Sequence, residues 1–143
     1  MKKIFIDTSV FIRFLTKDNP KKYEDCLLLL QLVSEGKIKP YISNIVIMEL
    51  IFILDRHYNF PKSKVTDAIA RLYLLRNLTV IEKTNTKIAL GLYQKFNIKY
   101  GDCLIASQVK KGIILISYDE EFDKITNLSV HPPEDVIGSL TSG

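Results

Sequence analysis

Short apolar runs of strand length alternate along the chain with longer stretches of helical periodicity. The short runs predict β-strands at Lys3 to Ile6, at about Lys39 to Ile42, at Thr79 to Glu82 and at Ile113 to Ser117. The last run is almost wholly apolar, which is typical of a strand in the buried middle of a parallel sheet.

Helix-start and helix-stop residues divide the segments between these runs. Asp7-Thr8-Ser9, Asn19-Pro20 and Thr84-Asn85-Thr86 are typical N-terminal capping sequences, and Gly36 is a typical stop. The predicted helices follow Ser9, run from Pro20 to Glu35, from Ser43 or Asn44 to about Tyr58, from Pro61 to about Arg76, from Thr86 to about Asn97, and from Gly101-Asp102 to Lys111-Gly112.

Strands separated by helices of this length need crossover connections, so the pattern predicts an α/β layered domain with a mainly parallel sheet. The sequence shows no repeat, linker or low-complexity tract, and 143 residues with 47% hydrophobic content are typical of one compact unit. We therefore expect a single domain over residues 1–143. Its tail from His131 to Gly143 is expected to form a short helical turn and then fray.

Composition and short sequence signals limit the possible cellular location and partners of the protein. The apolar run Ile4 to Ile6 stops at Asp7, which argues against a secretory signal, and the run Ile45 to Leu54 is too short to span a bilayer. Cys26 and Cys103 lack zinc or redox spacing. We expect a cytoplasmic protein without a membrane segment. The formal charge of +4 fits an anionic partner such as nucleic acid but does not single one out.

Acidic residues collect where functional groups of a parallel sheet are expected, beyond the carboxyl ends of the strands. Asp7 follows the first strand, Asp119 and Asp123 follow the fourth, and Asp102 opens the helix that leads into the fourth. Each also has a structural explanation, as a helix cap, a first-turn acid or a solvated turn. Together they predict three or four carboxylates at one edge.

Glu49 is the one residue from Ile45 to Leu54 that is not apolar, so a largely buried helix carries a carboxylate. A buried carboxylate needs a salt bridge with Lys or Arg, a proton, or a metal ion. Because like charges repel, several gathered carboxylates favour a cation among them. Oxygen ligands without a Cys/His cluster favour Mg²⁺ or Mn²⁺, and such ions serve nuclease or phosphatase chemistry.

Four segments with these acids resemble the motifs of PIN-domain nucleases, and most closely those of the small VapC-type toxins of toxin-antitoxin pairs. The match covers nearly the whole chain. The segments are Phe5-Ile6-Asp7-Thr8-Ser9, Met48-Glu49-Leu50, Tyr100-Gly101-Asp102-Cys103-Leu104-Ile105-Ala106 and Ser117-Tyr118-Asp119-Glu120-Glu121-Phe122.

The resemblance implies a three-layer αβα sandwich with a parallel sheet of about five strands, and an endoribonuclease that depends on Mg²⁺ or Mn²⁺. It assigns catalytic and metal-binding roles to Asp7, Glu49, Asp102 and Asp119, and a further metal position to Asp123. Thr8 and Ser9 match a hydroxyl position near metal water or substrate phosphate, and Arg13, one helical turn on, is a candidate phosphate contact.

The resemblance also implies a homodimer and a small antitoxin that covers the active-site groove. Tyr23, Leu27 and Leu30 form a candidate docking face, for which core packing is the alternative. Two other functions stay open: a stand-alone RNA-processing nuclease, and a non-catalytic module that binds nucleic acid or protein. If all five acids gather at one site, 11 acids face 20 bases elsewhere, a surface suited to RNA phosphates.

Overall fold

The computed structural model describes residues 1–141, and its strands form one parallel sheet in the order β3-β2-β1-β4-β5. The strands are β1 (Lys2–Ile6), β2 (Ile38–Ser43), β3 (Thr79–Ile81), β4 (Ile114–Ile116) and β5 (Val130–His131). The helices are α1 (Thr8–Thr16), α2 (Pro20–Ser34), α3 (Asn44–Arg56), α4 (Lys62–Leu72), α5 (Thr86–Lys95), α6 (Tyr100–Gln108) and α7 (Pro133–Thr141), with a 3-10 helix, η1 (Glu120–Lys124).

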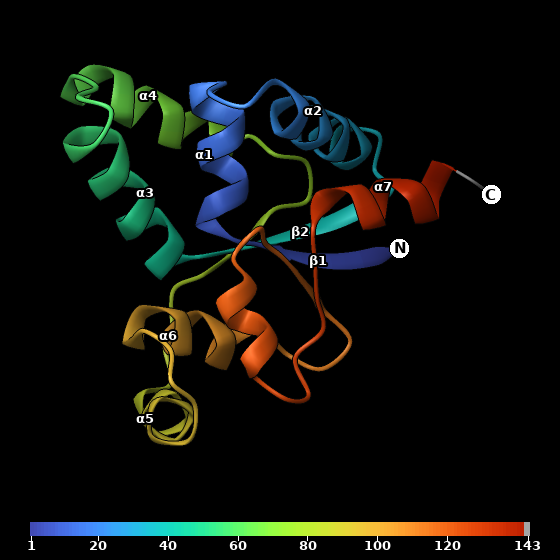
Figure 1. Cartoon of the computed structure of the whole chain (residues 1–143). Helices are drawn as coiled ribbons and strands as arrows, with labels where there is room; N and C mark the ends of the chain where they lie inside the picture. The colour runs from blue at the N-terminus through green and yellow to red at the C-terminus, as the bar shows by residue number, and fades with distance from the viewer. Residues whose placement is uncertain (142–143) are drawn as a thin grey trace.

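Helices cover both faces of the sheet, so the predicted three-layer α/β fold is confirmed. In Figure 1, α1 and α2 lie on one side of the strands, and α5 and α6 lie on the other. α7 packs against α2, and α3 packs against both α1 and α4. β1 lies between β2 and β4, and its residues Ile4, Phe5 and Ile6 are fully buried. This burial explains the uninterrupted apolar run in the sequence.

The largest differences from the sequence predictions lie in three places. The helix after Pro61 ends at Leu72 rather than near Arg76, and the chain then turns through Asn77, which has a φ of 60°. α6 ends at Gln108, because Val109 already has extended dihedral angles. The tail forms a two-residue strand, β5, and a full helix, α7, where a short turn was predicted. Residues 142 and 143, to which the predicted fraying extends, lie outside the described residues.

The described residues can be compared with the predictions on membrane spans and cysteines. No helix within residues 1–141 has the length and apolar character needed to cross a bilayer. Cys26 and Cys103 are buried as free thiols. The structure thus offers neither thiol as an exposed nucleophile or ligand.

The carboxyl ends of β1 and β4 bring two polar side chains together. The Asp7 N–H donates to the Ile116 carbonyl at 3.0 Å, and the Ser117 N–H donates to the His131 carbonyl at 3.0 Å. The hydrogen bonding of the sheet therefore continues one residue past each strand. Asp7 and Ser117 lie side by side although 110 positions separate them in the chain.

Candidate metal centre

A cavity of about 370 Å³ opens at this edge of the sheet, and we name it the acidic cavity. It collects seven of the eight site residues that the sequence predicts. These are Asp7, Thr8, Ser9, Arg13, Glu49, Asp102 and Asp119.

Asp7 is held by two hydroxyl groups, one from Ser117 just after β4 and one from Ser9 in the first turn of α1. Ser117 Oγ donates to Asp7 Oδ2 at 2.7 Å, and Ser9 Oγ donates to the same oxygen at 3.0 Å. Each hydroxyl also accepts a backbone N–H, from Asp119 at 2.9 Å and from Tyr118 at 3.0 Å. Burial raises the pKa of Asp7, although these hydrogen bonds act in the opposite direction. The carboxylate is therefore oriented rather than free to rotate.

Asp7 also caps α1, since its side chain accepts the Ser9 N–H. The structural explanation as a helix cap is therefore confirmed for Asp7, and it is compatible with a ligand role. A capping carboxylate is fixed relative to its helix, which suits a group that must hold a ligand in one position.

Glu49 extends from the middle of α3 toward the start of α6. Thr8 Oγ1 donates to Glu49 Oε1 at 2.8 Å, and a Cβ atom on Gly101 would stand 3.3 Å from Glu49 Oε2. No Lys or Arg among residues 1–141 forms a salt bridge with Glu49, so the salt-bridge alternative is wrong for it. Burial, and then the charge of Asp7, raise its pKa.

Asp102 lies in the first turn of α6, and only 4% of its surface is exposed. Its Oδ2 atom is buried without a hydrogen-bond partner among residues 1–141. Burial raises the pKa of Asp102 to about 7; Lys99 opposes this, and the charges of Asp119, Asp7 and Glu49 add to it. The ionised form of Asp102 thus lacks compensation from the rest of the chain.

The donor set fits a hard divalent cation. Within residues 1–141, no three Asp, Glu, His or Cys side chains stand together as a ready set of direct ligands. Mg²⁺ does not require one, because it is commonly bound through one or two carboxylates and keeps several waters. The unpartnered oxygen of Asp102 and the mutual repulsion of the acids are both relieved by such an ion.

Sequence comparison agrees with this geometry. The family model described as the PIN domain matches residues 4–128, which contain every acid of the cavity. The chain belongs to the PIN domain family. Its residues outside the match are the first three and the segment that contains β5 and α7.

Individual PIN domain relatives resemble the chain over most of its length. A VapC ribonuclease of Aquifex aeolicus (strain VF5) is 25% identical over 132 residues, which are 91% of this chain and 97% of the relative. The VapBC2 structure of Rickettsia felis, bound to a DNA fragment from its promoter, aligns with a TM-score of 0.65 at 20% identity, over 91% of this chain and 98% of that one. Mycobacterium tuberculosis VapC20, a sarcin-ricin loop cleaving toxin, aligns with a TM-score of 0.60 at 17% identity, over 84% and 92%.

Asp123 does not line the acidic cavity of this PIN domain. It is exposed on η1 and lines a neighbouring hollow together with His131 and Glu134. Asp119 lines both hollows, and its side chain caps η1 by accepting the Glu121 N–H at 3.0 Å. Asp119 and Asp123 thus share the neighbouring hollow, and of the two Asp119 alone lines the acidic cavity.

Two other predicted contacts are already engaged within the chain. Arg13 forms an ion pair with Asp18 at 3.1 Å, and Tyr58 donates to the same carboxylate at 2.8 Å. The Thr8 and Ser9 hydroxyls donate to the carboxylates of Glu49 and Asp7. In the structure these hydroxyls orient acids.

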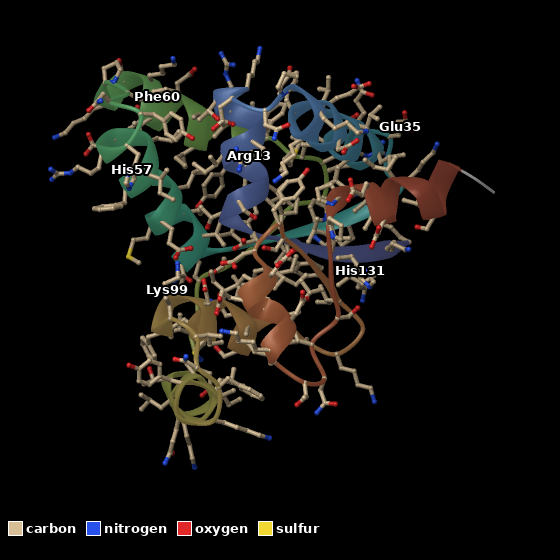
Figure 2. All side chains as sticks on the ribbon, in the orientation of Figure 1. Arg13, Glu35, His57, Phe60, Lys99 and His131 are labelled. Atoms are coloured by element: carbon tan, nitrogen blue, oxygen red, sulfur yellow. The ribbon has the colours of Figure 1, made fainter. Side chains whose placement is uncertain are left out.

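Sequence reasoning missed several residues of the cavity. Lys99 precedes α6, and its charge acts to lower the pKa of Asp102 and of Glu49. Figure 2 shows Lys99 and Arg13 on different helical layers. Lys22 lies over the Tyr118 ring at 4.6 Å. Ser117 had a detectable signal, because it ends a buried strand as Ile6-Asp7 does.

Proposed function

We propose that this PIN domain protein is a divalent-metal-dependent endoribonuclease that hydrolyses RNA phosphodiester bonds in the acidic cavity. The observation that carries the proposal is the buried, unpartnered carboxylate oxygen of Asp102 among three further acids. The name of the VapC ribonuclease of Aquifex aeolicus supports RNA as the substrate.

In this proposal Asp7, Glu49, Asp102 and Asp119 hold Mg²⁺ or Mn²⁺ as ligands and do not act as nucleophiles. Such an ion lowers the pKa of bound water and neutralises charge on the phosphoryl group. The chain supplies orientation: Ser117 and Ser9 fix the Asp7 carboxylate, and Thr8 fixes Glu49.

Cationic side chains on the wall of the cavity are suited to hold the substrate phosphates. Lys99, Lys22 and Arg13 all line it. Arg13 has to exchange its contact with Asp18 for a phosphate, whereas Lys99 has no ion-pair partner within residues 1–141. Lys22 also lacks an ion pair among these residues but already lies over the Tyr118 ring, so we assign the first phosphate contact to Lys99.

The protein is further proposed to be the toxin of a toxin-antitoxin pair and to form a homodimer. The similar VapBC structures of Rickettsia felis and Haemophilus influenzae support the toxin assignment. The predicted docking face is partly wrong, because Leu30 is in the core, while Tyr23 and Leu27 are half-buried. Met48, Ile51 and Phe52 on α3 are the exposed apolar alternative for an antitoxin contact.

The decisive experiment uses the purified chain without any partner, with labelled RNA and Mg²⁺ or Mn²⁺. Wild type is expected to cut the RNA, and Asp7→Asn is expected to lose cleavage because it removes an oriented ligand. Asp67→Asn, an exposed change on α4, is the matched control. No cleavage with either ion would leave the binding module as the better explanation. Cleavage without growth arrest in cells would favour the stand-alone nuclease.

A further inference from the structure

A second cavity, of about 640 Å³, has the opposite chemistry, and we name it the lysine cavity. Four lysines line it, and no Asp or Glu does. The lysines are Lys3, Lys83, Lys110 and Lys111. All four are exposed, and none takes part in an ion pair within residues 1–141.

The end of α6 explains the position of only two of the four lysines. Lys110 and Lys111 directly follow the end of α6, where cations interact favourably with the helix dipole. Lys3 comes from β1 and Lys83 from the segment before α5, so no single helix end explains them. The fold thus gathers four like charges from three segments in one cavity without an acid in its lining among the described residues.

The neutral lining of the cavity is suited to a nucleotide. Thr84, Asn85 and Ser107 offer hydroxyl and amide groups, and Tyr41 with Ile81 offers apolar surface. The volume lies within the usual range of about 300 to 1,000 Å³ for ligand pockets. Unpaired lysines beside hydroxyl and amide groups are typical of phosphate recognition.

The position of the cavity favours a polynucleotide over a free nucleotide. Asp102 in the acidic cavity and Gln108 in the lysine cavity lie on the same helix, α6. Six residues of α-helix rise about 9 Å, which is about three steps of a stacked strand at 3.4 Å each. A strand whose phosphate sits at the acids reaches the lysines within a few nucleotides by passing along α6.

We propose that the lysine cavity is a second binding site for the RNA, which holds backbone phosphates a few nucleotides from the bond that is cut. The inference rests on the proposed function, because it assigns the same RNA to both cavities. It adds a site that does not touch the metal ligands.

The test measures binding without metal, so that nothing is cut. Fluorescence anisotropy of a labelled 20-nucleotide RNA with EDTA gives the affinity over a range of salt concentrations. The double variant Lys110→Gln/Lys111→Gln is expected to bind more weakly, and its slope of log affinity against log salt is expected to fall by about 1.4, at 0.7 per lysine.

The matched control is Lys62→Gln/Lys64→Gln, which removes the same charge from exposed positions on α4. It is expected to keep the wild-type slope. Equal slopes for wild type and the cavity variant would overturn the proposal, and so would equal losses in both double variants. Melting temperatures verify that each variant is folded.

Calorimetry with ATP separates the two sources of phosphate. Micromolar ATP binding that disappears in Lys110→Gln/Lys111→Gln, with unchanged RNA affinity, would overturn the RNA assignment in favour of a free nucleotide. If Lys110→Gln/Lys111→Gln shows the expected change of slope in RNA binding but wild type cuts no RNA with Mn²⁺, the proposed function fails. The assignment of the lysine cavity as an RNA-binding site is then retained. The two failures are therefore distinguishable.

Discussion

α6 connects two cavities of opposite charge. At its first turn, Asp102 joins three other carboxylates, and hydroxyl groups orient two of these, Asp7 and Glu49. Beyond its last turn, Lys110 and Lys111 join two other lysines without any acid. With the four acids set apart, 12 acids face 20 Lys and Arg over the rest of the chain.

The difference between the cavities lies in how the chain prepares each one. In the acidic cavity, Asp7 and Asp102 are buried, and short hydrogen bonds hold the Asp7 carboxylate, which suits a site that must fix one ion in place. The four lysines of the lysine cavity are exposed and have long side chains, which suits sequence-independent contact with phosphates. The low net charge of +4 conceals this separation.

The largest effect expected from this comparison is a pH dependence of stability that originates in the acidic cavity. The pKa of Asp102 is raised from 3.8 to about 7, so the folded state binds more protons than the unfolded state between these values. Stability of the metal-free protein should therefore fall as pH rises from about 4 to 7, by up to about 1.4 kcal/mol per pH unit for this group.

Urea unfolding in EDTA at several pH values measures this slope. Asp102→Asn is expected to flatten it, and saturating Mg²⁺ or Mn²⁺ is expected to stabilise wild type most at high pH. Asp67→Asn, with an exposed side chain on α4, is the control. If the slope of the unfolding free energy against pH is the same in wild type and in Asp102→Asn, burial of this carboxylate does not limit stability.

A smaller effect is expected from the hydroxyl that links the two strand ends. Ser117→Ala removes the donor to Asp7 and the acceptor of the Asp119 N–H, so two acids lose orientation. Groups that hydrogen-bond to a metal ligand without touching the metal contribute about ten- to a hundredfold in metal affinity or activity. Calorimetric titration with Mn²⁺ measures the change.

The exposed Ser34, whose hydroxyl bonds only within α2, provides the matched control Ser34→Ala. Equal Mn²⁺ affinity in Ser117→Ala and Ser34→Ala would contradict a role for Ser117 in holding Asp7. A loss of Mn²⁺ binding with an unchanged melting temperature would place the effect in the cavity.

The smallest effect is expected at Gly101. A Cβ there stands 3.3 Å from Glu49 Oε2, so Gly101→Ala displaces that carboxylate by a few tenths of an ångström. The backbone of Gly101 is not in the positive-φ region, and Ala should stabilise the helix by about 0.4 to 1 kcal/mol. Higher melting temperature with several-fold weaker Mn²⁺ binding is the expected combination. If the melting temperature and the Mn²⁺ affinity of Gly101→Ala change in the same direction, Glu49 does not depend on the close approach of Gly101.

Much of the fold could be predicted from the sequence because its signals are local. The buried strands are continuous apolar runs, and Asn19 and Asn85 cap helices as their side chains suggest. β5 could not be predicted, because two residues have no periodicity and are held only by pairing with β4. The ends of α4 and α6 were placed too late for a similar reason, since propensity alone does not fix the last turn.

The candidate site also contains residues that the sequence places correctly and one that it does not. Asp7 and Asp119 follow strands, and Asp102 starts a helix, so their meeting at one sheet edge follows from parallel topology. The resemblance assigns Asp123 a further metal position, but the structure places this residue on η1, outside the lining of the acidic cavity.

The sequence by itself determined the α/β class, the acids that line the acidic cavity and the membership of the PIN domain family, because each rests on local runs and motifs. The tertiary structure alone decided that Ser117 clamps Asp7, since strand order brings residues 110 positions apart together. It also decided that Lys3 and Lys83 join the lysines beyond α6. Strand order and helix packing depend on the whole core, and no local pattern encodes them.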